Sequence, residues 1–482
     1  MTAASESSRA PELPAILAGI RPHARWRELG LLVIVAVALT IGSISLGATL
    51  RARETERGAG IPDGAFAPYG ATLLAIYVGA LLLAHFVQVL AGRRSDQVLL
   101  PAVGLLGGIS LLLMERLPQD LARQFGGLAQ TQLVWLLIAI ALITVTAVAV
   151  RSDAWLRLYK YTWAAAGIAL LLLTFVFGRD VSGARLTLDL GPLSGQPSEL
   201  LKVILVVFLA GYLSENRPLL VEQSTRIGPL RLPPLPYLAP MAAMWAIALG
   251  IVVVQRDLGA ALLFFAVFLL LLYITTARAS YVAIGLVLFV AGSALMYKLF
   301  AHVQQRVDIW LDPFHDPSGA GYQVIQALYA FARGGILGTG LGNGLPTVGG
   351  RLPIPAVHTD FPFAALGEEL GLIGVLAILG VYLVVVVRGL RIAASAADDF
   401  RALLAAGLSL VVGVQAFIIA AGNLKMIPLT GITLPFISYG GSSLLANALV
   451  IGLLLALSDR GVEPPPVPRR GRIARLFDRG AP

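Results

Sequence analysis

Residues 258–276 read LGAALLFFAVFLLLLYITT, an unbroken apolar stretch without a charged side chain. A helix that crosses the hydrocarbon core of a bilayer needs about 20 such residues. The sequence holds twelve predominantly apolar stretches of about this length, which lie at 29–49, 70–91, 97–114, 130–150, 160–178, 197–214, 235–255, 258–276, 280–300, 361–388, 402–421 and 436–457. Because an open strand cannot satisfy its backbone in lipid, we expect all twelve to be helices. The predicted fold is therefore an all-α, polytopic membrane bundle.

The composition supports this class. Of the 482 residues, 57% are hydrophobic and only 13% are charged, whereas soluble domains carry about 25% charged residues. The mean hydropathy of +0.82 also excludes disordered, coiled-coil and collagen-like chains. No cysteine is present, which excludes disulfides and thiolate chemistry, and the five histidines are scattered, which argues against a zinc site.

The net charge of +9 has two interpretations. A basic soluble protein binds nucleic acid, but cytoplasmic loops of membrane proteins also collect Lys and Arg. With the N-terminus inside, the inner segments hold more Lys and Arg than the outer ones. We therefore expect both termini in the cytoplasm and no nucleic-acid partner. The outer segments are then 179–198, 301–360 and 422–435, and the basic tail lies against anionic lipid.

The sixth predicted span opens with the charged motif QPSELLK at 196–202. Glu199 and Lys202 are three residues apart and share one face of a helix that begins at Pro197. They could form a local ion pair or the charged floor of an outward-facing cavity. Asp257, in the outer turn between two spans, could simply cap the next helix.

Three carboxylates lie near the start of the tenth span, at Asp360, Glu368 and Glu369. Asp360 could be a helix N-cap, or its semi-buried carboxylate could have a raised pKa and act as a general base. The segment 428–443, before and into the last span, holds prolines, glycines and hydroxyls at outer membrane depth. Such backbone survives there only where it is buried in protein or lines a wet cavity, and packing through small residues is the alternative.

These motifs resemble the SEDS family, the RodA/FtsW/SpoVE group of bacterial cell-wall proteins. The blocks that carry the resemblance are GARLTLDLG around Arg185, QPSELLK (196–202), QRDLGAAL (255–262), QQRVDIWLDPFHDPSGAGYQVIQAL (304–328), GGILGTGLGNG (334–344), HTDFPFAALGEELGLIG (358–374) and IPLTGITLPFISYGGSSL (427–444). They occur in the family's order. The chain departs from the family at Arg185, which is shifted by one position, and at Arg256, Ala327 and Ala356.

The resemblance implies a fold and an activity. The fold is a ten-span core with two extra N-terminal spans, which divides the chain into a cytoplasmic segment (1–28), N-terminal spans (29–114), a catalytic core (115–457, with the loop 301–360) and a cytoplasmic tail (458–482). The activity is that of a peptidoglycan glycosyltransferase, which polymerises lipid II at the outer face of the cytoplasmic membrane, more like RodA in cell elongation. The alternatives are an FtsW-like division polymerase and a lipid II flippase.

The resemblance also implies site residues and partners. Asp360 corresponds to the proposed catalytic base. The residues expected to bind substrate are Glu199, Lys202, Arg185, Gln196, Ser198, Arg306, Gln326, His358, Thr359, Ser438, Tyr439 and Ser442. Mg²⁺ or Mn²⁺ is expected without an organic cofactor. The expected partners are lipid II and a class B penicillin-binding protein.

Overall fold

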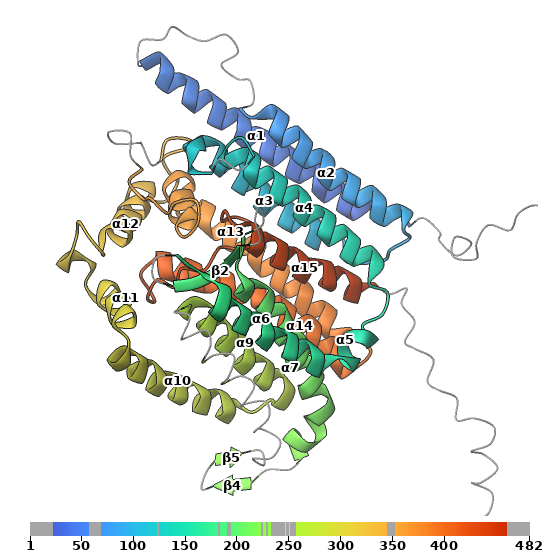
Figure 1. Cartoon of the computed structure of the whole chain (residues 1–482). Helices are drawn as coiled ribbons and strands as arrows, with labels where there is room; N and C mark the ends of the chain where they lie inside the picture. Colours follow the sequence, from blue (N-terminus) through green and yellow to red (C-terminus); the bar gives the residue numbers. More distant parts are fainter. Residues whose placement is uncertain are drawn as a thin grey trace, which may run out of the picture.

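The computed structural model describes residues 23–56, 69–122, 125–181, 184–189, 194–222, 225–227, 230–232, 246, 250, 257–344 and 352–459. Within them, apolar helices dominate (Figure 1). They are α1 (Trp26–Glu56), α2 (Ala71–Leu90), α3 (Leu99–Arg116), α4 (Leu128–Ala149), α5 (Ala154–Leu158), α6 (Lys160–Phe177), α7 (Pro197–Glu222), α9 (Leu258–Thr276), α10 (Ala279–Leu299), α11 (Ala301–Leu311), α12 (Tyr322–Gly334), α13 (Pro362–Ala394), α14 (Asp399–Asn423) and α15 (Gly441–Ser458).

In the described part of the chain, ten helices are long and apolar enough to cross a membrane: α1, α2, α3, α4, α7, α9, α10, α13, α14 and α15. This confirms the predicted polytopic helical fold. The expected span at 160–178 is the helix α6, whose apolar part, Lys160–Thr174, is shorter. The expected span at 235–255 lies outside the described residues apart from positions 246 and 250.

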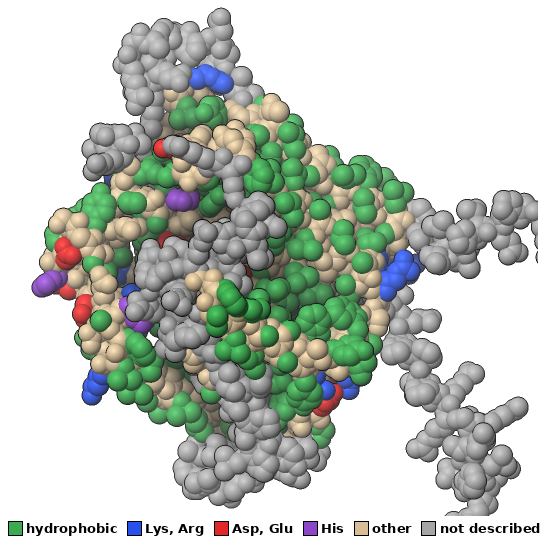
Figure 2. Space-filling view, viewed as in Figure 1, with side chains coloured by type: hydrophobic (Ala, Val, Ile, Leu, Met, Phe, Trp, Pro, Cys, Tyr) green, Lys and Arg blue, Asp and Glu red, His purple; other side chains and the backbone are tan. Residues whose placement is uncertain are grey.

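The bundle has a buried centre and a lipid-facing rim. Within its apolar window, 83% of α7 is buried but only 11% of α10. α14 packs against α13, α7 and α9, and α15 packs against α4 and α7. The visible surface carries hydrophobic side chains over most of its flanks, with few charges between them (Figure 2). Such a surface is stable only in contact with lipid.

Short strands, which the sequence analysis did not predict, precede and follow α7. β1 (Arg179–Val181), β2 (Ala184–Asp189) and β3 (Ser194–Gly195) form an antiparallel sheet in the expected outer loop 179–198. β4 (Thr225–Ile227) and β5 (Leu230–Leu232) form a hairpin after α7. Strands of two to six residues fall below the length at which an alternating pattern is recognisable.

The segment 301–360, predicted as a long outer loop, contains two helices. α11 follows α10 directly, and α12 packs against α13. α12 buries one apolar face, which includes Val324, Ile325 and Ala327. Between the two helices, a one-turn 3₁₀ helix (Pro313–His315) and a turn closed by Asp316 reverse the chain, because the Asp316 carboxylate accepts from Gly319 N and Ala320 N (3.0 and 2.9 Å). The described parts of this segment, 301–344 and 352–360, are therefore folded.

Candidate functional site

Asp360 lies in a turn immediately before α13. The backbone N–H groups of Asp360 and Phe361 both donate to Ala356 O, at 3.0 and 3.2 Å. The N-cap residue of α13 is Phe361, and no side chain caps this helix end. The N-cap interpretation of Asp360 is therefore wrong. Its side chain is partly exposed, and it forms no ion pair within 4 Å in the part of the chain that the structure describes.

Three consecutive carbonyls hold this turn in place. Tyr439 N donates to His358 O (2.8 Å), Ser438 Oγ donates to Thr359 O (2.6 Å), and Asn423 Nδ2 donates to Asp360 O (2.9 Å). The first two donors come from the segment 428–443, and Asn423 ends α14. Because all three contacts use the backbone of 358–360, they fix the turn without occupying the Asp360 carboxylate.

The basic side chain that acts on the Asp360 carboxylate is Arg306 of α11. Its Nη1 donates to Thr430 O (2.8 Å) and Leu429 O (3.3 Å), which joins α11 to the segment 428–443. The guanidinium acts electrostatically on the carboxylates of Asp257 and Asp360. Burial raises the pKa of Asp360 above its ordinary value, whereas a hydrogen bond from Thr359 and the charge of Arg306 lower that pKa. The balance favours a carboxyl that can take up a proton.

Several polar atoms around this turn have no hydrogen-bond partner within the described residues. They are His358 Nδ1, Asn423 Oδ1 and Thr430 Oγ1, and all are buried. His358 also packs its ring against Tyr439, with the centroids 5.8 Å apart, and burial lowers the pKa of His358. Unsatisfied buried groups are costly, so the two that adjoin Asp360, on His358 and Asn423, favour a site that a polar ligand completes. Thr430 lies beside Arg306 instead.

Asp257 caps α9, as one interpretation of the sequence predicted. Its Oδ1 accepts from Ala260 N (3.0 Å), and its Oδ2 accepts from Ser198 Oγ (3.0 Å) and Gln196 Nε2 (3.2 Å). Burial raises the pKa of Asp257, and these hydrogen bonds oppose the shift. The start of α7 and the start of α9 are thus joined, and both Asp257 and Asp360 face Arg306.

Glu199 and Lys202 lie deeper, in a network that spans three helices. Lys202 is 1% exposed. Its Nζ donates to Glu199 Oε2 (2.5 Å), Gln415 Oε1 (2.9 Å) and Asn447 Oδ1 (3.2 Å). A lysine ammonium has three N–H groups, so all of them are used. The pair holds α7 to α14 and α15, and a direct contact of Lys202 with substrate stays a prediction.

Glu368 and Glu369 differ from Asp360 because each of them forms an ion pair. Glu368 forms an ion pair with Arg333 (3.1 Å), and Glu369 forms one with Arg116 (2.6 Å). Of these three carboxylates, Glu368 and Glu369 bind arginines, and only Asp360 lacks an ion pair in the described chain.

The other predicted residues are only partly connected to this site. Hydrogen bonds unite Ser438, Tyr439, His358 and Thr359 with Asp360, and Gln196 and Ser198 with Asp257. Gln326 on α12 and Ser442 in the first turn of α15 are partly buried and make no described hydrogen bond to either group. Arg185 lies on β2, and its side chain is outside what the structure describes.

Sequence reasoning missed Asn423, Gln415 and Asn447. Each is a buried amide inside or at the end of a predicted span. That position was a usable signal, since polar side chains at membrane depth usually find a partner across helices.

Comparison with known proteins agrees with these observations. Residues 97–461 match the family model FTSW_RODA_SPOVE, described as "Cell cycle protein". The peptidoglycan glycosyltransferase RodA of Mycobacterium tuberculosis is 39% identical over 450 residues, which cover 92% of each chain. A probable peptidoglycan glycosyltransferase FtsW of Geobacter metallireducens is 37% identical over 298 residues, covering 61% of this chain and 75% of the relative.

A solved structure has the same fold. A chain described under "Structural coordination of polymerization and crosslinking by a peptidoglycan synthase complex" is 28% identical, with a TM-score of 0.59, and the match covers 76% of this chain and 98% of that chain. The family model spans most of the present sequence, and the mycobacterial relative aligns with nearly all of it. The chain therefore belongs to the FtsW/RodA/SpoVE family of multi-pass membrane proteins.

Proposed function

We propose that this protein is a RodA-type peptidoglycan glycosyltransferase that polymerises lipid II. The 39% identity to a mycobacterial protein of that name, over 92% of both chains, supports the activity. The observation that carries the proposal is Asp360, whose turn is fixed by three backbone contacts while its carboxylate has no ion pair among the described residues. A carboxylate on a fixed backbone turn, without an ion pair among the described residues, is suited to proton transfer.

In the proposed reaction, the 4-hydroxyl oxygen of the acceptor sugar attacks the anomeric carbon of the donor. The bond between that carbon and the donor's diphosphate breaks, and Asp360 takes the hydroxyl proton. A positioned base of this kind contributes about 10²–10⁴-fold to a rate. Burial raises the pKa of Asp360, which makes it a better proton acceptor than an exposed aspartate. The departing diphosphate is anionic, and Arg306 is the cation that faces this turn.

The expected divalent cation finds no ready cage among these residues. In the described part of the chain, no group of three or more His, Asp or Glu side chains could hold a metal ion. Mg²⁺ commonly binds through one or two carboxylates together with substrate phosphates. We therefore propose that Mg²⁺ or Mn²⁺ arrives with the donor's diphosphate.

We further propose that the site lies at the outer face of the cytoplasmic membrane, with both termini in the cytoplasm. The Lys and Arg bias of the sequence supports this orientation. A class B penicillin-binding protein is the proposed partner, since one similar chain comes from a study of a peptidoglycan synthase complex that polymerises and crosslinks. The crosslinking would then follow polymerisation at the same membrane face.

The test is polymerisation of labelled lipid II by the purified protein, alone and with its cognate class B partner, in Mg²⁺ or Mn²⁺. Wild type should make glycan strands, and Asp360→Ala should make none. Asp308→Asn, a change in the same segment 301–360, is the matched control and should retain activity. Glycan strands from Asp360→Ala would contradict the role of this residue, and lipid II translocation into liposomes without polymer would contradict the reaction itself.

A further inference from the structure

The helix that follows Asp360 is broken, and a loop fills the break. At Gly371 the backbone of α13 leaves the helical conformation, with φ 66° and ψ −169°. The glycine loop, which we define as residues 334–344, supplies the missing partners. Thr339 N and Gly340 N donate to Glu368 O and Glu369 O (2.9 and 3.0 Å), and Leu372 N and Ile373 N donate to Gly335 O and Ile336 O (2.9 and 3.2 Å). The loop therefore sets the direction of the short outer piece of α13, which begins two residues after Asp360.

Side chains strengthen this insertion. The Glu369 carboxylate accepts from Gly342 N (2.8 Å) and Gly344 N (3.1 Å) and pairs with Arg116 (2.6 Å). Arg116, at the end of α3, also donates to Gly344 O (3.1 Å). The far end of the glycine loop is thereby fixed to α13 and α3.

The other side of the glycine loop rests on α1. A Cβ at Gly342 would lie 2.9 Å from Leu46 Cδ1 and 3.5 Å from Thr49 Cβ, and Leu341 Cδ1 lies 3.7 Å from the Cβ position of Gly42. Leu46 is only 2% exposed. α1 lies along one edge of the bundle in Figure 1. It therefore packs against the glycine loop, and this loop in turn contacts the start of α13.

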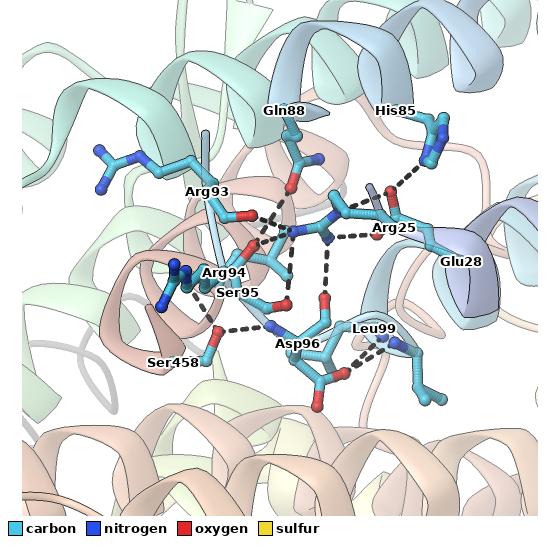
Figure 3. A network of polar contacts seen from close by, with 12 residues as sticks. Arg25, Glu28, His85, Gln88, Arg93, Arg94, Ser95, Asp96, Leu99 and Ser458 are labelled. Carbon is cyan, nitrogen blue, oxygen red and sulfur yellow. Dashed lines mark hydrogen bonds and ion pairs between the residues drawn. The ribbon is translucent and has the colours of Figure 1, made fainter. Parts of the chain in front are cut away.

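The opposite end of α1 is fixed by buried polar contacts (Figure 3). Arg25 is 2% exposed and donates to Ser95 Oγ (2.7 Å) and to Glu28 Oε1 (3.1 Å). Glu28, which is fully buried, also meets His85 Nδ1 of α2 (2.7 Å). Sliding of α1 would leave the buried groups of Arg25 and Glu28 without their partners on Ser95 and His85, so this end of α1 is held in place.

The helix pair α1–α2 lies outside the family model, which begins at residue 97. We infer that this pair is a positioning element for the catalytic turn: anchored at one end by Arg25 and Glu28, it holds the glycine loop through Leu46 and so orients the start of α13 next to Asp360. The inference rests on the proposed function only in taking Asp360 as the reacting group. The contact between α1 and the loop stands independently of it.

The first test compares two identical substitutions on α1. Leu46→Ala removes the side chain that meets the glycine loop. Leu39→Ala removes one that is 1% exposed and packs on Gly108 of α3 instead. Since a misplacement of about 1 Å can cost about 10²-fold in rate, we expect the smaller shift in Leu46→Ala to lower kcat about tenfold. Both variants should lower the thermal unfolding midpoint by similar amounts, but Leu39→Ala should keep the wild-type kcat.

The second test is rescue by a crosslink. The chain has no cysteine, and the Cβ separation of 3.5 Å between positions 49 and 342 fits a disulfide. Thr49→Cys with Gly342→Cys should therefore crosslink on oxidation, measured as loss of maleimide labelling that dithiothreitol reverses. Because Gly342 has φ 83°, a cysteine there strains the loop by itself, so the oxidised and reduced forms of the same double-cysteine protein are compared. In the Leu46→Ala background, oxidation should raise kcat above that of the reduced form, and reduction should remove the gain.

Two results would overturn the inference. One is equal kcat in Leu46→Ala and Leu39→Ala when wild type is active. The other is a double-cysteine Leu46→Ala protein whose kcat is the same in the oxidised and the reduced form, because fixing the loop to α1 should raise it. Failure of the proposed function looks different: the crosslink would form, but wild type would make no glycan or Asp360→Ala would remain active.

Discussion

Glu199 in the first turn of α7 and Asp360 just before α13 are two carboxylates whose surroundings differ in one respect. Glu199 is paired with Lys202, whose three N–H groups are all used by acceptors on α7, α14 and α15. Asp360 has its backbone fixed but no ion pair within the described residues, and buried polar atoms without partners lie beside it. A network whose hydrogen-bonding groups all have partners, which we call saturated, holds helices together. Polar groups without partners can instead bind a ligand. The comparison supports the proposal that Asp360 is the reacting carboxylate and that Glu199 holds the helices together.

The largest expected effect concerns the saturated network. Lys202→Met leaves the Glu199 carboxylate buried without its cation, so the free energy of unfolding should fall by about 3–5 kcal/mol. The thermal unfolding midpoint in detergent measures this. The matched double variant, Lys202→Met with Glu199→Gln, should recover much of the loss. A single variant as stable as wild type would show that the network does not hold the helices together.

A smaller effect is expected at the frame of the Asp360 turn. Ser438 Oγ donates to Thr359 O (2.6 Å) and accepts from Leu434 N (2.8 Å). Ser438→Ala leaves both buried groups unpaired, which should cost about 1–3 kcal/mol of unfolding free energy. The polymerisation rate should fall as well, because the turn is less fixed. Ser409→Ala is the control, since this buried hydroxyl of α14 donates to Ala405 O of its own helix, and an equal loss of rate there would argue against the frame.

The subtlest expected effect is on pH dependence. A base works as its carboxylate, so the rate falls as the pH drops through the pKa of Asp360. The charge of Arg306 lowers that pKa. In Arg306→Gln the pKa should be higher, and the acid limb of the pH–rate profile, normalised to its plateau, should move to higher pH. Arg333→Gln, whose partner is Glu368, should leave the limb in place. An unmoved limb in Arg306→Gln would separate Arg306 from the base.

Much of the fold was predictable because hydropathy is local. An apolar run such as 258–276 is long enough to cross the bilayer, and it satisfies its backbone there by forming a helix, whatever the rest of the chain does. The sequence also predicted that Asp360 is semi-buried, which the structure confirms, and its position on the outer side stays a prediction. The partners of Lys202 were not, since Gln415 and Asn447 lie 213 and 245 residues away along the chain. α12 was hidden in a glycine-rich segment, because it is amphipathic and too short to resemble a span.

The contact between α1 and the glycine loop was equally invisible in the sequence. Glycines at 338, 340 and 342 have positive φ and allow the loop to turn tightly. Nothing in the run of residues 334–344 says which helix receives it. The sequence therefore indicates which groups can react, and the packing decides which of them are left free to do so.

The most direct measurement is the polymerisation rate and the unfolding midpoint of Asp360→Asn on one preparation. Burial raises the native pKa of Asp360, so the native state gains stability as the pH falls through that pKa and loses it as the pH rises. At neutral pH a neutral Asn relieves this cost. We predict a rate lower by about 10²–10⁴-fold with an unchanged or higher midpoint. A retained rate, or a rate and midpoint that fall together, would contradict the account.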